Sequence, residues 1–72
     1  MSEQRVKTEI TGKVWKIEVA VGDTVAEEDP IMILESMKME IPVLAPVKGT
    51  VREILVGEGD AVTEGQAVAI IA

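Results

Sequence analysis

One lysine in this sequence differs from the other four in its immediate neighbours. Lys38 lies between Met37 and Met39, in a chain whose other methionines are Met1 and Met32. A primary amine can accept an acyl group and form an amide. Adjacent side chains in an extended or turn backbone point apart, so we expect the lysine to project while both thioethers turn aside and pack on the body. The plainer interpretation, which composition alone favours, is a solvated lysine beside two gap-filling methionines.

The surroundings of Lys38 are acidic. No other basic residue lies between Lys16 and Lys48, whereas residues 18–40 contain seven acidic residues. The nearest two, Glu35 and Glu40, could be recognised by a modifying enzyme or orient a turn, but two solvated carboxylates are an equally good interpretation. A lysine amine is almost wholly protonated at neutral pH, so its acylation requires a base and an activated carboxyl from another protein.

Composition argues against catalysis by this chain itself. The 72 residues form one small domain with no histidine, no cysteine and a net charge of −6. The usual general base, thiol nucleophile and softer metal ligands are missing, so we predict no catalytic residue and no metal site. Asp23 and Asp60 each follow a glycine without further alternating oxygen ligands, which predicts side chains that close their own turns rather than bind calcium.

Nucleic acid and membrane are also improbable partners. The acidic balance opposes phosphate binding, and Trp15 is the single aromatic residue, so no stacking platform exists. The longest apolar run without proline or charge, Ala67 to Ala72, is far below the roughly 20 residues that a membrane span requires. We expect a soluble, cytoplasmic, monomeric protein, and the absence of cysteine fits a reducing compartment.

The elements that must position Lys38 are predicted to be short strands. Val, Ile and Thr make up 24 of the 72 residues, and glycine and proline recur at short intervals. Alternation predicts two strand faces, one formed by Val6, Thr8 and Ile10 and the other by Trp15, Ile17 and Val19.

An internal repeat organises these strands. Residues 12–35 align without gaps on residues 49–72, at a constant offset of 37, with nine of 24 pairs identical. Identical pairs include turn residues such as Gly22/Gly59 and Asp23/Asp60. Each half is therefore predicted to form the same unit of a strand, a turn and a second strand. We predict an all-β fold in which two such units, related by an approximate two-fold axis, interlock as a small sandwich or flattened barrel, with Lys38 at the junction on a protruding hairpin, residues 35–40.

The run ESMKME, residues 35–40, resembles the attachment motif of biotin carboxyl carrier domains. The resemblance covers about residues 7–72 and includes V-G-D-x-V at residues 21–25, K-G-T-V at 48–51 and E-G-D-x-V at 58–62. It implies the biotinyl/lipoyl fold, called a hammerhead: a flattened barrel of two four-stranded antiparallel sheets. Because the sequence starts just before the first strand, we expect a free-standing carrier. Ser36 stands where alanine is frequent, and Glu28 stands where the second half has Gly65, which predicts strain if that turn needs positive φ.

The resemblance also implies a function. A biotin protein ligase would attach biotin covalently to Lys38, with Glu35 and Glu40 as possible ligase contacts. Met37 and Met39 would present the lysine and distinguish biotin enzymes from lipoate enzymes. The arm would then swing between a biotin carboxylase and a carboxyltransferase, carrying a carboxyl group for an acyl-CoA-type carboxylase such as the acetyl-CoA carboxylase of fatty acid biosynthesis. The chain would be a carrier, not an enzyme.

Two alternatives remain open at this point. A lipoyl domain, or a carrier that accepts both groups, shares the fold and the exposed lysine, although lipoyl sites typically place Asp and Ala beside the lysine. An unmodified interaction module of the same fold is the second alternative. The mass added to the chain in its native cells would separate all three.

Overall fold

The structure is a computed structural model that describes residues 3–72, and the chain forms eight strands over this range. Their bounds are β1 (Gln4–Lys7), β2 (Gly12–Ile17), β3 (Thr24–Val25), β4 (Pro30–Ser36), β5 (Met39–Leu44), β6 (Gly49–Ile54), β7 (Ala61–Val62) and β8 (Ala67–Ile71). No helix occurs in residues 3–72, and so none that is long and apolar enough to cross a membrane.

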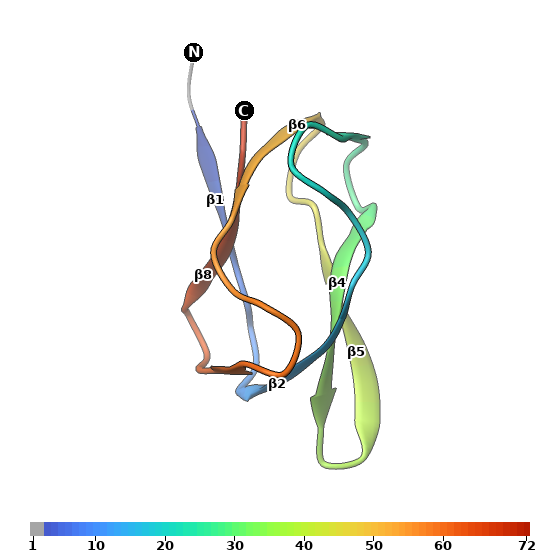
Figure 1. The fold of residues 1–72 in the computed structure, drawn as a ribbon, viewed down its shortest axis with the longest axis vertical. Coiled ribbons are helices and arrows are strands. Elements are labelled where there is room, and N and C mark those ends of the chain that lie inside the picture. Colours follow the sequence, from blue (N-terminus) through green and yellow to red (C-terminus); the bar gives the residue numbers. More distant parts are fainter. Residues whose placement is uncertain (1–2) are drawn as a thin grey trace.

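The strands form two four-stranded antiparallel sheets, in the orders β1-β8-β6-β3 and β5-β4-β2-β7. The sheets pack into an elongated body of 36 × 19 × 18 Å, with the β4–β5 hairpin at one end and the C-terminus and the start of β1 at the other (Figure 1). This arrangement confirms the predicted all-β fold class.

The strand pairing repeats at the 37-residue offset found in the sequence. Val14 pairs with Leu34 between β2 and β4, and Val51 pairs with Ile71 between β6 and β8. Each pair of strands also has a register shift at the same place, before Lys16 in the first half and before Glu53 in the second. The approximate two-fold symmetry therefore extends to the bulges.

The two halves interlock through their shortest strands. β3 pairs with β6 of the second half, and β7 pairs with β2 of the first half. β1 pairs with β8, and β4 pairs with β5. Only the β2–β4 and β6–β8 pairings lie within one half, so neither half can complete a sheet alone.

The symmetry also relates β1 to β5, which the sequence alignment did not reveal. Val6 pairs with Ala69, and at the same offset Val43 pairs with Met32. Over residues 4–11 and 41–48, Val6/Val43 is the one identical pair, so these strands share a position in the fold but almost no side chains.

A single apolar core fills the space between the two sheets. Its members are nearly all strand residues and include the fully buried Ile31, Met32, Leu34, Val68 and Ile71. The predicted first face is correct in that Val6 and Thr8 are buried and Ile10 is partly buried, although β1 ends at Lys7. The Thr8 hydroxyl donates to the Ile10 carbonyl (2.9 Å), so this buried polar group is satisfied.

The predicted second face is wrong for Trp15, which is 51% exposed. The bulge between Val14 and Lys16 interrupts the alternation, so Val14 is buried and the next two residues are both exposed before Ile17 turns back toward the core. Nothing in the sequence around Val14 indicated that the strand contains an extra residue at Trp15.

Side chains close the turns between strands. The carboxylate of Asp23 accepts a hydrogen bond from the Ala20 amide (2.9 Å), and that of Asp60 accepts one from the Gly57 amide (2.8 Å). These contacts confirm the turn-closing role predicted for both aspartates.

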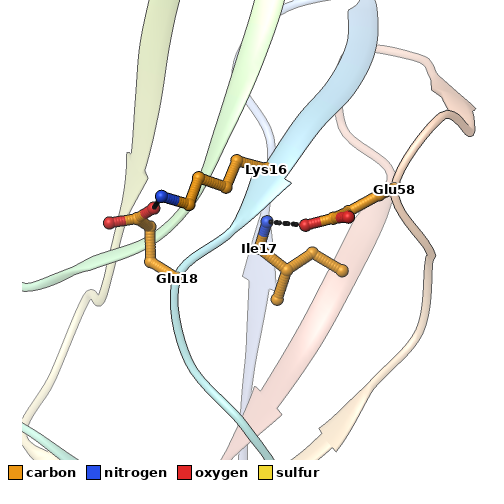
Figure 2. Close-up of polar contacts among 4 residues, drawn as sticks. All are labelled: Lys16, Ile17, Glu18 and Glu58. Atoms are coloured by element: carbon orange, nitrogen blue, oxygen red, sulfur yellow. Dashed lines mark hydrogen bonds and ion pairs between the residues drawn. The ribbon is translucent and has the colours of Figure 1, made fainter.

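A longer contact ties the second half to the first. Glu58, in the β6–β7 turn, accepts a hydrogen bond from the backbone amide of Ile17 (3.1 Å), beside the ion pair between Lys16 and Glu18 (3.6 Å; Figure 2). The residue at the symmetric position is Val21, which has no side-chain acceptor, so this interaction exists on one side of the molecule only.

Candidate functional site

The β4–β5 hairpin carries the candidate attachment site. Its strands remain paired to the tip, where Glu35 faces Glu40 and Ser36 faces Met39. The tip projects from the end of the body opposite the C-terminus and the start of β1 (Figure 1). By the 37-residue offset, β8 and β1 correspond to the two strands of this hairpin, and they approach the opposite end of the body.

The tip is a two-residue turn formed by Met37 and Lys38. Both have positive φ, 52° and 66°. Two consecutive positive φ values match the twist of paired strands, but the residues usually found there are asparagine and glycine. A side chain in this region costs roughly 1–2 kcal/mol per residue. The sequence therefore keeps methionine and lysine at the tip despite a local backbone cost.

Lys38 stands clear of the rest of the protein. It is exposed, and within residues 3–72 its ammonium takes part in no ion pair, since the single pair there joins Lys16 and Glu18. Exposure alone does not distinguish it, because the other lysines are also exposed. Its position at the tip of a projecting hairpin does, since the others lie on β1, on β2 or before β6.

The two methionines do not pack on the body, and the prediction that they would is wrong. Met37 is 91% exposed and Met39 is 62% exposed. The reason is geometric: Met37 lies in the turn at the projecting end of the β4–β5 hairpin (Figure 1), where both turn residues have positive φ. The tip thus presents an amine between two solvent-facing thioethers.

Glu35 and Glu40 lie directly opposite each other across the hairpin. Like charges in this position repel, so the pair weakens the hairpin by a few tenths of a kcal/mol to about 1 kcal/mol. Lys13 is the cross-strand neighbour of Glu35 on the other side, without forming an ion pair in residues 3–72. Both carboxylates are exposed beside the tip, and their recognition by a ligase stays a prediction.

Two hydrogen-bonding residues support the hairpin next to its tip: Ser36, which the sequence marked only by the alanine that is frequent there, and Thr11, which sequence reasoning did not single out. The Ser36 hydroxyl donates to the Thr11 carbonyl (3.0 Å), and the Thr11 hydroxyl accepts a hydrogen bond from the Glu64 amide (3.0 Å). Gly12 passes so close that a Cβ there would lie 2.7 Å from the Glu35 carbonyl oxygen. The match of Gly12 to Gly49 was the available signal for this close approach, while nothing in the sequence marked Thr11.

Comparison with known proteins identifies the family. Residues 5–71 match the biotin/lipoyl family model, described as biotin-requiring enzyme. The chain belongs to the biotin/lipoyl attachment domain family. It is 45% identical over 60 residues to a biotin/lipoyl attachment protein of Bacillus subtilis, with 83% of this chain and 82% of the relative covered.

Two further proteins are similar to this chain over most of its length. The biotin carboxyl carrier protein of Streptococcus mutans is 48% identical over 61 residues, which cover 85% of this chain and 47% of the relative. The crystal structure of urea carboxylase from Kluyveromyces lactis superposes with a TM-score of 0.94 at 40% identity. That match covers all of this chain and 6% of the carboxylase chain. This chain is thus a biotin/lipoyl carrier domain homologous to parts of carboxylases.

The residues at the tip fit a covalently attached group. Attachment through an amide requires an accessible primary amine and space around it, and Lys38 offers both at the end of the molecule. Covalent attachment needs no enclosing pocket around the amine.

Proposed function

We propose that this chain is a biotin carrier and that Lys38 is its attachment residue. The observation that carries the proposal is the position of an exposed lysine, free of ion pairs within residues 3–72, at the strained two-residue tip of the one projecting hairpin. The B. subtilis and S. mutans relatives, whose names refer to attachment and carriage, support it.

Attachment would proceed by acyl transfer from biotinyl-adenylate on a biotin protein ligase. The Lys38 Nζ attacks the biotin carboxyl carbon, the bond from that carbon to the adenylate oxygen breaks, and AMP leaves while the ammonium loses two protons. The chain supplies the nucleophile and its placement, and the ligase supplies the base and the activated carboxyl. Once bound, biotin supplies the capacity to carry a carboxyl group.

The projecting hairpin would then bring the attached biotin to the sites of the partner proteins. Its tip lies at the far end of a body 36 Å long, so a group on Lys38 can enter another protein's site while the sheets remain outside. Because biotin is tethered to the chain, its effective concentration near each partner's site is raised, and each carboxyl transfer becomes a local event. We propose that the partners are a biotin carboxylase and a carboxyltransferase of an acyl-CoA carboxylase, and that the chain itself is not catalytic.

The attachment residue is tested by replacing Lys38 with arginine, which stays charged and is not acylated. Lys38→Arg should abolish incorporation of biotin by a biotin protein ligase with ATP, as measured by intact mass and streptavidin blotting. Lys48→Arg is the matched control, because Lys48 is exposed but lies on the body, and it should accept biotin at the normal rate. Biotin on the Lys38→Arg protein would assign attachment to another lysine.

The same mass measurement on protein from its native cells tests the alternatives. Biotin, lipoate and an unmodified amine give three different masses. Lipoate on Lys38 would make the chain a lipoyl or dual carrier, and an unmodified chain in cells that contain an active ligase would favour an interaction module.

A further inference from the structure

Three methionines of the β4–β5 hairpin fall into two contrasting environments. Met37 and Met39 are 91% and 62% exposed, whereas Met32, on β4 of the same hairpin, is fully buried at 0%. Large apolar side chains this exposed find no packing energy in the isolated molecule. Their thioether sulfurs are therefore open to reagents in solution, and the sulfur of Met32 is not.

Thioether sulfur reacts with peroxide without assistance from an enzyme. The sulfur lone pair attacks one peroxide oxygen, the O–O bond breaks, and one molecule of water is released for each sulfoxide formed. The chain contains no cysteine, so no thiol consumes the oxidant first. Cells reverse the change with methionine sulfoxide reductases, which makes the modification a reversible one.

We propose that Met37 and Met39 form a peroxide-sensitive modification site, and that their oxidation to sulfoxides blocks acylation of the adjacent Lys38. The second clause rests on the proposed function. Oxidation replaces an apolar thioether by a polar, chiral group one atom larger, on both sides of the amine. A ligase surface that covers the tip must bury these side chains, and it loses that contact when they carry oxygen.

The first experiment measures where oxygen is added. The full chain is treated with hydrogen peroxide, and sulfoxide at each methionine is quantified by peptide mass mapping over time. Met37 should oxidise at least about tenfold faster than Met32, because reaction at a buried sulfur requires rare unfolding. In concentrated urea the two rates should converge. Equal rates at Met37 and Met32 in the folded chain would overturn the proposed site.

The second experiment measures the consequence for acylation. Chain with sulfoxide confirmed at Met37 and Met39 should take up biotin from a biotin protein ligase at least about tenfold more slowly than untreated chain. Treatment with methionine sulfoxide reductases of both stereospecificities, with dithiothreitol as reductant, should restore the rate. Unchanged uptake by the sulfoxide form, or no recovery after the sulfoxides have been removed, would overturn the block.

A variant without oxidisable tip residues provides the control. Met37→Leu with Met39→Leu keeps apolar side chains at the tip, so whatever its own rate of biotin uptake, peroxide should leave that rate unchanged. Slowing of this variant by peroxide would place the effect outside the tip. If untreated chain takes up no biotin at all, the proposed function and the block fail together, whereas selective oxidation of Met37 is decided by the mass map alone.

Discussion

Glu28 and Gly65 occupy equivalent turns with the same unusual backbone. Glu28 has φ of 73° and Gly65 has φ of 87°, and their amides donate to Ala45 and Thr8, residues that correspond at the 37-residue offset. The strain predicted from the sequence mismatch is therefore present. Glycine adopts this conformation freely, whereas a side chain incurs roughly 1–2 kcal/mol.

Exchanging these residues should change stability in opposite directions. Glu28→Gly should be neutral or stabilising by up to about 1 kcal/mol, because relief of strain and removal of one of three consecutive acids offset the added unfolded-state entropy. Gly65→Glu should destabilise by about 1 kcal/mol or more, through strain alone, since a Cβ there would meet no atom within 4 Å. Urea unfolding midpoints at matched slope measure both effects. A lower midpoint for Glu28→Gly with no change for Gly65→Glu would contradict the strain argument.

At the scale of the element, the hairpin depends on the body that holds it. Its tip contains two strained residues and two facing carboxylates, Glu35 and Glu40. An isolated hairpin is marginally stable in water even without such costs. The Ser36–Thr11 hydrogen bond and the β2–β4 pairing supply the support that a peptide lacks.

The isolated peptide of residues 35–40 should therefore be a poor acceptor of biotin. A cost of about 2 kcal/mol for the two left-handed residues corresponds to roughly thirtyfold lower population of the presented form. We expect at least that loss in acylation rate relative to the full chain at equal concentration, measured by mass spectrometry. Equal rates would mean that the ligase reads the local sequence without requiring the hairpin.

The limits of sequence-based prediction are also clearest at this scale. The 37-residue repeat predicted how β2, β4, β6 and β8 correspond, because turn glycines and strand apolar residues repeat there. It could not predict the equivalence of β1 and β5, since their contacts to β8 and β4 use different side chains. The bulges and the positive φ of Met37 could not be predicted from the sequence either. Neither feature can be recognised in a sequence when no glycine or asparagine stands at the position.

At the scale of the whole molecule, most strand pairings join one half to the other. Cutting the chain between Met37 and Lys38 would leave each piece with one pairing of its own, β2–β4 or β6–β8. Pieces of this size rarely bury enough apolar surface to fold unaided.

We therefore expect residues 1–37 and 38–72 to be unfolded separately and to assemble on mixing. Circular dichroism and amide proton dispersion should report little structure in either piece and native-like strands in the equimolar mixture. The intact chain is the reference for the native spectrum. A folded, monomeric piece of 38–72 would show that the halves are more independent than their pairing indicates.

The pairing of β1 with β8 also has a consequence for biosynthesis. β1 is synthesised first but cannot pair until β8, the last strand, has been synthesised, because Gln4 pairs with Ile71 and Val6 with Ala69. At a synthesis rate of about 5–20 residues per second, β1 therefore remains unpaired for several seconds. The sequence of β1 is QRVK, with one core residue, Val6, whereas the sequence of β8 is AVAII. The segment that stays unpartnered longest is thus a polar one, and the apolar strand β8 emerges when its neighbours β1 and β6 are already available.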